Sequence, residues 1–115
     1  MSVPDPLPSQ ARVEWELLKL LHLSGSLTTQ VAYSALADRF ALTAEQRARR
    51  IAGDRTENAW QNRCRWARDR LVQQGLLDPR RRGRWLLTEA GKQEAGPRGD
   101  FQTWVSAYSL EELGL

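Results

Sequence analysis

The hydrophobic residues of this 115-residue chain recur mostly at the three- and four-residue spacing of amphipathic helices. The predicted helices cover residues 9–24, 28–40, 43–51, 57–74 and 88–95. Ser9 and Thr88 precede apolar runs as N-caps, and Thr43 with Gln46 has the spacing of a capping box. Gly75 follows the longest run, at the position where many helices end in a left-handed residue. The pattern therefore predicts a mainly helical chain.

Between residues 76 and 87 the helical spacing gives way to short apolar runs. Leu76-Leu77 and residues 84–87 are two such runs, and the segment between them contains Pro79 and Gly83, which favour a turn. Two short strands joined by a turn predict a small β-hairpin.

The order of these elements is typical of a winged helix-turn-helix, mainly α with a small β-hairpin, in which residues 43–51 add an extra helix between the second and third helices. Three prolines mark residues 1–8 as an N-terminal arm. Residues 9–95 form the predicted winged-helix domain, and residues 96–115 form a linker and a C-terminal helical tail. The tail carries an apolar stripe made of Phe101, Trp104, Val105 and Tyr108.

The charge becomes informative when it is divided along the chain. The net charge is only +3, from 17 basic and 14 acidic residues. Residues 39–84 hold 13 of the 15 Arg against five acidic residues, a net of +8, whereas residues 1–38 and 85–115 carry −2 and −3. A concentrated positive charge is typical of proteins that bind a polyanion, usually nucleic acid. The alternative is a solvated arginine-rich face without a partner.

The composition also excludes several classes of protein. A single cysteine, Cys64, permits no internal disulfide, and no Cys/His cluster is present for a zinc site. No apolar run approaches the roughly 18 residues of a membrane span, and the first ten residues lack the pattern of a signal peptide. We therefore expect a cytoplasmic protein with no metal, no cofactor and no membrane partner.

On a helical wheel, the helix of residues 57–74 separates an apolar side from a polar side. Its predicted core side consists of Trp60, Cys64, Ala67 and Leu71. The other side carries amide and guanidinium groups, which bind adenine and guanine edges in the major groove. The predicted DNA-binding residues of this helix are Asn58, Gln61, Asn62, Arg65 and Arg68. Those of the hairpin, which suit phosphates or a minor groove, are Arg80, Arg81, Arg82 and Arg84.

Several separated motifs of residues 57–91 resemble a known family. They are Asn62-Arg63 followed by Trp66-Ala67, Gly75-Leu76-Leu77, Arg82-Gly83-Arg84-Trp85, and Thr88 followed by Gly91. In this order they resemble the N-terminal domain of Mrr-type restriction proteins, and the resemblance extends over about residues 9–95. It implies a winged-helix DNA-recognition module, which in that family often precedes a nuclease domain and helps to target DNA, including modified DNA.

The chain departs from the family in ending at Leu115, without the Glu-x-Lys or Gln-x-Lys triplet of such a nuclease. We therefore expect no DNA cleavage by the chain itself and a nuclease domain that is either separate or lost. The expected function is binding of double-stranded DNA, as the targeting module of a restriction or modified-DNA-recognition system. Two alternatives stay open: a stand-alone transcription regulator, and a winged helix that binds proteins instead of DNA.

One further surface concerns assembly. Trp15 and Leu18 lie on a second apolar side of the first helix, and Trp104 and Tyr108 could cover them from the same chain or from a second copy. These four residues are the predicted homodimer or docking surface, because symmetric DNA targets suit two copies of a winged helix.

The remaining singular side chains have structural interpretations. His22, the only histidine, is expected to be a packing or surface residue, and Cys64 a buried apolar residue, with redox sensing as the minor alternative. Trp85 is expected to pack inward against the helix of residues 57–74. Trp66 lies off the core side of that helix, where it either wedges the helix against its neighbours or stacks on a base.

Overall fold

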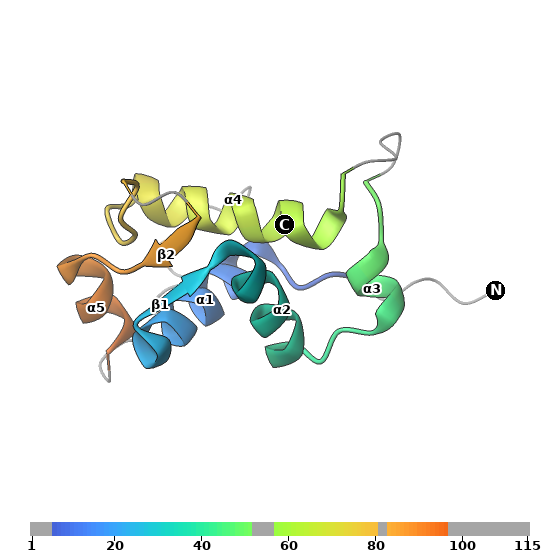
Figure 1. Cartoon of the computed structure of the whole chain (residues 1–115), viewed down its shortest axis with the longest axis horizontal. Coiled ribbons are helices and arrows are strands. Elements are labelled where there is room, and N and C mark those ends of the chain that lie inside the picture. Colours follow the sequence, from blue (N-terminus) through green and yellow to red (C-terminus); the bar gives the residue numbers. More distant parts are fainter. Residues whose placement is uncertain (1–5, 52–56, 81–82, 97–115) are drawn as a thin grey trace.

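The computed structural model describes residues 6–51, 57–80 and 83–96, and the elements follow the expected order (Figure 1). They are α1 (Gln10–Ser24), β1 (Ser26–Thr28), α2 (Thr29–Arg39), α3 (Ala44–Ala48), α4 (Ala59–Gln73), β2 (Arg84–Leu86) and α5 (Glu89–Ala95). The long helices α1 and α4 pack against each other, and α3 and α5 lie at opposite ends of the molecule (Figure 1). The fold is therefore a mainly helical winged helix-turn-helix with a small antiparallel sheet, and α3 is the extra helix.

Capping side chains explain where the helices begin. The Oγ of Ser9 and the Oγ1 of Thr88 each accept a backbone hydrogen bond from the first turn of α1 and α5, as predicted. Thr43 and Gln46 form the predicted capping box of α3. This helix is shorter than expected, because the backbone becomes extended at Arg49, whose carbonyl oxygen accepts a hydrogen bond from the Ala59 amide at 2.8 Å.

The core lies where α1, α2 and α4 meet. All four residues of the predicted core side of α4 are at most 2% exposed, so that prediction is confirmed. The Trp60 indole also donates a hydrogen bond to the Tyr33 carbonyl oxygen at 3.0 Å, which links α4 to α2. In α2 the neighbouring Ala32 and Tyr33 are buried, whereas Val31 is 50% exposed.

The two residues of the predicted docking surface that lie on α1 are buried within the chain. Leu18 has no exposed surface and Trp15 is only 7% exposed, and both belong to the hydrophobic core of the described residues. The reason is that α1 is covered on more than one side, by α4, by α2 and by α5. Lys19 lies over the Trp15 ring, 4.7 Å from its centroid, and donates a hydrogen bond to the Ala95 carbonyl oxygen of α5. Trp104 and Tyr108, the other half of the prediction, lie outside the described residues, as does the rest of the predicted tail after Gly96.

The β-structure differs from the predicted hairpin in its pairing. β2 forms its ladder with β1, in the register Ser26 to Leu86, Leu27 to Trp85 and Thr28 to Arg84. The predicted strand Leu76-Leu77 contributes an isolated bridge from Leu77 to Leu87 and is not a regular strand. The chain still turns back on itself there, because the Asp78 amide donates to the Leu86 carbonyl oxygen at 3.0 Å.

The junction between α4, the wing and α5 depends on a close backbone approach. Gly75 ends α4 with a φ of 77°, as predicted from its position. The Thr88 hydroxyl donates to the Gly75 carbonyl oxygen at 2.6 Å, and the Thr88 amide donates to the Leu76 carbonyl oxygen at 3.0 Å. In the first turn of α5, Gly91 packs so tightly that a Cβ atom there would lie 2.1 Å from the Leu76 oxygen. The spacing of Thr88 and Gly91 is therefore a packing requirement.

Candidate nucleic-acid interface

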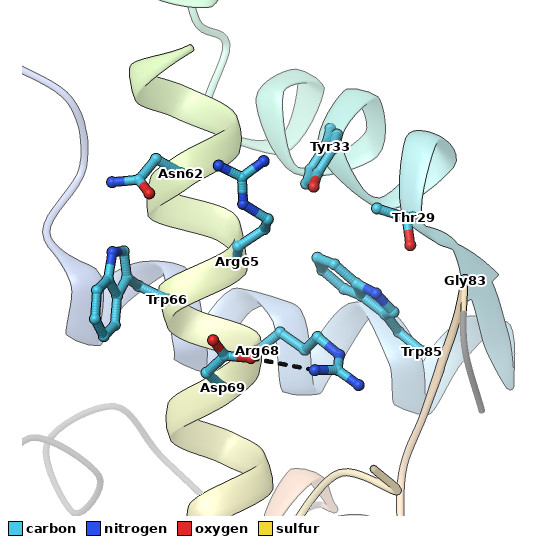
Figure 2. A pocket seen from close by; sticks show the side chains of 9 residues that line it. All are labelled: Thr29, Tyr33, Asn62, Arg65, Trp66, Arg68, Asp69, Gly83 and Trp85. Carbon is cyan, nitrogen blue, oxygen red and sulfur yellow. Dashed lines mark hydrogen bonds and ion pairs between the residues drawn. The ribbon is translucent and has the colours of Figure 1, made fainter. Parts of the chain in front are cut away.

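The exposed side of α4, the start of α2 and the wing strand β2 enclose an open groove with a volume of about 440 Å³ (Figure 2). It is lined by Thr29, Tyr33, Asn62, Arg65, Trp66, Arg68, Asp69, Gly83 and Trp85. The Tyr33 and Trp85 rings meet edge to face with centroids 5.9 Å apart and form the apolar wall opposite α4. Trp85 is 3% exposed, so it packs inward as predicted, with its ring against Tyr33 of α2; its packing against α4 stays a prediction.

Three predicted DNA-binding residues of α4, namely Asn62, Arg65 and Arg68, line this groove together. Gln61 lies next to it, in a second hollow between α2 and α4. Within the described residues, the side-chain amides of Gln61 and Asn62 form no hydrogen bond, so their donors and acceptors are available to a ligand.

Asn58 has a role within the fold that the sequence interpretation did not include. Its Oδ1 accepts a hydrogen bond from the Gln61 amide at 2.9 Å, which makes it the N-cap of α4. Its Nδ2 donates to the Arg47 carbonyl oxygen at 2.8 Å. Both ends of the amide are therefore engaged within the fold, and a bidentate contact to a base would require Asn58 to give up the cap.

The arginines of this face have acidic neighbours that the sequence interpretation did not include. Arg65 pairs with Glu57, and Arg68 pairs with Asp69 at 3.1 Å (Figure 2). Arg80 pairs with Asp78 at 3.1 Å, and the hydrogen bond that its guanidinium donates to this carboxylate raises the pKa of Arg80. Each guanidinium is therefore held in place by a carboxylate while part of it remains exposed.

The two kinds of acidic partner differ in how well the sequence indicates them. Asp78 and Arg80 are close enough in sequence for a local Asx turn, since the Asp78 Oδ1 also accepts from the Arg80 amide at 2.9 Å. Glu57 lies two residues before the start of α4 and eight residues before Arg65, so no local rule predicts that pair. Thr29 and Tyr33 are groove residues that sequence reasoning missed, because they come from the neighbouring helix.

The wing adds a positive charge beside the groove. Arg84 is exposed at the start of β2, opposite Thr28 of β1, and no described acidic side chain pairs with it. Gly83 precedes it with a φ of 69° and accepts a hydrogen bond from the Thr29 amide through its carbonyl oxygen. Arg81 and Arg82, also predicted to bind DNA, lie outside the described residues.

On the other side of α4, one side chain of α4 and one of α3 donate hydrogen bonds to the backbone of the N-terminal arm. The Arg63 guanidinium donates to the Pro8 carbonyl oxygen at 2.5 Å, and the Gln46 amide donates to the Pro6 carbonyl oxygen at 3.1 Å. Burial lowers the pKa of Arg63, although its charge is retained. Arg63 therefore has a structural role that its place in an arginine-rich segment does not reveal.

The side chains of catalytic type do not form a reactive constellation in the part of the chain that the structure covers. His22 is exposed at the end of α1, and no group of three or more His, Cys, Asp or Glu residues within those ranges could hold a metal ion. Among the same residues, no helix is long and apolar enough to cross a membrane.

We predict that Cys64 is unreactive in the folded protein. It has no exposed surface, and burial raises the pKa of its thiol to about 12, against a smaller opposing effect of Arg63. The thiolate is the reactive form, so a thiol reagent at pH 8 should modify the folded protein only through unfolding. In denaturant the reaction should be complete within minutes, and fast modification of the native chain would contradict the prediction.

The same shift gives a pH dependence for stability. The raised pKa means that the folded chain keeps this proton between about pH 9 and pH 12, where the unfolded chain has released it. The contribution of Cys64 to the free energy of unfolding therefore falls as the pH rises through that window.

A family model described as the Mrr N-terminal domain matches residues 11–95. The chain is also similar to the "Type IV methyl-directed restriction enzyme EcoKMrr" of Escherichia coli (strain K12), with 41% identity over 59 residues. That segment is 51% of this chain and 19% of the enzyme, so the match spans about a fifth of the relative's length. No solved structure matches.

Proposed function

Because this chain belongs to the Mrr N-terminal domain family, we propose that it binds double-stranded DNA as the targeting module of a restriction system that recognises modified DNA. The observation that carries the proposal is the groove beside α4, where arginines and an unengaged amide lie between a helix and a wing. α4 enters the major groove, where Gln61, Asn62 and Arg65 read base edges, and Arg68 supports them. The wing arginines, with Arg84 foremost, bind phosphates or a minor groove.

The acidic partners fit this function. When Arg65 or Arg68 binds DNA, it exchanges a carboxylate of its own chain for an acceptor on the DNA. Glu57 and Asp69 then lie close to the duplex and repel phosphates that are not held by an arginine. The face therefore favours duplexes in which base contacts offset this repulsion, which is a way to gain specificity.

A nuclease, in the same or a separate polypeptide, is part of the proposal, because the relative named above is a restriction enzyme. A homodimer stays a prediction that now depends on Trp104 and Tyr108 alone, since Trp15 and Leu18 are buried in the core of the same chain.

We predict that duplex binding depends steeply on salt. If arginines neutralise about five phosphates, the logarithm of the association constant should fall with the logarithm of the salt concentration at a slope between about −4 and −5. The measurement is a fluorescence anisotropy titration of a labelled duplex over a salt series, with unmodified and methylated copies of the same sequence. A slope near zero would contradict DNA binding. Equal affinity for the two copies would contradict recognition of that modification.

A further inference from the structure

The tryptophan on the outer side of α4 is exposed in a way that the core does not explain. Of the four tryptophans in the described ranges, Trp15, Trp60 and Trp85 are 2–7% exposed, whereas Trp66 is 56% exposed. An indole held in water forgoes the free energy that burial of its apolar surface would provide. A ring that wedged α4 against its neighbours would be buried, and a ring that stacks on a base is covered only by that base. Neither role expected from the sequence therefore covers Trp66 within the folded chain.

The position of Trp66 places it among the groups proposed to read DNA. Asn62 lies one turn before it on α4 and Asp69 lies three residues after it, so the three side chains are neighbours on the helix surface. Figure 2 shows Asn62 and Trp66 projecting from the same side of α4, away from Tyr33 and Trp85. Trp66 is thus an apolar surface within an otherwise polar and charged face.

The major groove of DNA offers few apolar groups for such a surface. Adenine, guanine and cytosine present hydrogen-bond donors and acceptors there, and thymine alone among the four ordinary bases adds a 5-methyl group. A cytosine that carries a 5-methyl group presents the same apolar surface at the same ring position. Asn62 can bind the adenine of an adenine–thymine pair, and Asp69 can accept from the amino group of a cytosine. Either contact would bring a pyrimidine C5 position close to the ring of Trp66.

We propose that Trp66 contacts the 5-methyl group of a pyrimidine in the major groove and makes this group a determinant of specificity. The inference rests on the proposed duplex binding by α4. It requires no change of fold, because the ring is already exposed and lines the groove. A contact to a methyl group distinguishes Trp66 from the arginines beside it, because the contacts of the arginines depend on charge.

The test replaces single methyl groups on the DNA. A binding duplex is selected from a random-sequence library, and each thymine is then replaced, one at a time, by uracil, which lacks only the methyl group. In a second series each cytosine is replaced by 5-methylcytosine. Burial of one methyl group corresponds to an affinity change of about fourfold, so we expect one thymine-to-uracil change to weaken binding of the natural protein by about fourfold, or one cytosine methylation to strengthen it by as much. The first series identifies thymine as the source of the methyl group and the second identifies methylcytosine.

The protein variants make the inference falsifiable. Trp66→Ala should bind the methylated and methyl-free duplexes equally, whereas Trp66→Phe should keep part of the difference. Leu23→Ala is the matched control, because Leu23 is another exposed apolar residue, 75% exposed near the end of α1, and does not line the groove. It should bind as the natural protein does. Circular dichroism establishes that each variant is folded.

The outcomes separate the two proposals. Duplex binding in which no methyl change alters the affinity, or in which Trp66→Ala weakens every duplex equally, would overturn the role of Trp66 and leave DNA binding intact. Absence of binding to any selected duplex would overturn the proposed function and, with it, the role of Trp66.

Discussion

Replacing Arg65, Arg68 and Arg84 together by glutamine should reduce the affinity for duplex DNA by a factor of at least about 100. Each guanidinium that bonds to a base edge or a phosphate contributes roughly 1–3 kcal/mol, so removal of all three costs more than about 3 kcal/mol. These residues span the site, with two on α4 and one at the start of β2. The slope of the salt dependence should also become shallower by about 0.9 for each phosphate that is no longer neutralised. Anisotropy titrations over the same salt series measure both effects.

A second triple variant separates direct binding from net charge. Arg12, Arg39 and Lys92 lie on α1, α2 and α5 and do not line the groove. Replacing them by glutamine removes the same formal charge and should weaken binding by less than about threefold at moderate salt, where distant charges are screened. If the two variants bound DNA equally weakly, the groove beside α4 would not be the DNA-binding site.

Gly91→Ala should be the most destabilising single substitution considered for this fold. A Cβ atom at this position would lie 2.1 Å from the Leu76 carbonyl oxygen and 3.2 Å from the Leu87 Cβ, so α5 would have to move away from the wing. Alanine gains up to about 1 kcal/mol over glycine in helix propensity. Overpacking costs about 1–3 kcal/mol and sometimes more, and the displacement also weakens the bond between the Thr88 amide and the Leu76 oxygen, worth about 1 kcal/mol. The clash therefore outweighs the propensity.

We expect the free energy of unfolding to fall by about 2–3 kcal/mol, which corresponds to a melting temperature lower by roughly 10–20 °C for a domain of this size. Thermal unfolding followed by circular dichroism measures it. Gly96→Ala is the matched control, since a Cβ atom there meets its nearest neighbour at 3.4 Å, an ordinary contact. A Gly91→Ala protein as stable as this control would mean that α5 does not pack on the wing as described.

The parts of the fold that local sequence determines were predictable. Ser9, Thr43 and Thr88 begin their helices through hydrogen bonds that span only three residues, and Gly75 ends α4 through its own backbone angle. Local signals failed where a distant segment competes for the same groups. Residues 49–51 pair with residues 57–59 and so do not continue α3.

The sheet illustrates the same limit. Ser26–Thr28 is too short to show the alternation typical of a strand, and nothing near it indicates a partner as distant as Arg84–Leu86. Leu76-Leu77 is more apolar than Ser26–Thr28 and closer in sequence to Arg84–Leu86, so it was the more obvious partner for Arg84–Leu86. The strand that does pair carries Trp85, which packs against Tyr33 in the assembled core.

The candidate site was predictable in its residue types but less so in its details. Helical periodicity alone placed Asn62 and Arg65 on the exposed side of α4 and Arg68 beside the core side, and the structure gathers the three in one groove. It could not show that Asn58 caps the helix or that Glu57 pairs with Arg65, because one side chain can satisfy either a backbone or a ligand. Periodicity also could not show how Trp15 and Leu18 are covered, because α1 contacts α2, α4 and α5.

The pairing of β1 with β2 has a consequence for biosynthesis. The ribosome produces β1 directly after α1, but its partner strand is made only after α2, α3 and α4 have been completed. Until then the hydrogen-bonding edge of Ser26–Thr28 has no partner strand. Closing the long loop between Thr28 and Arg84 is an entropically costly, slow step. Synthesis must therefore proceed through β2 before the wing can close, and the late-made strand is the one that shapes the groove.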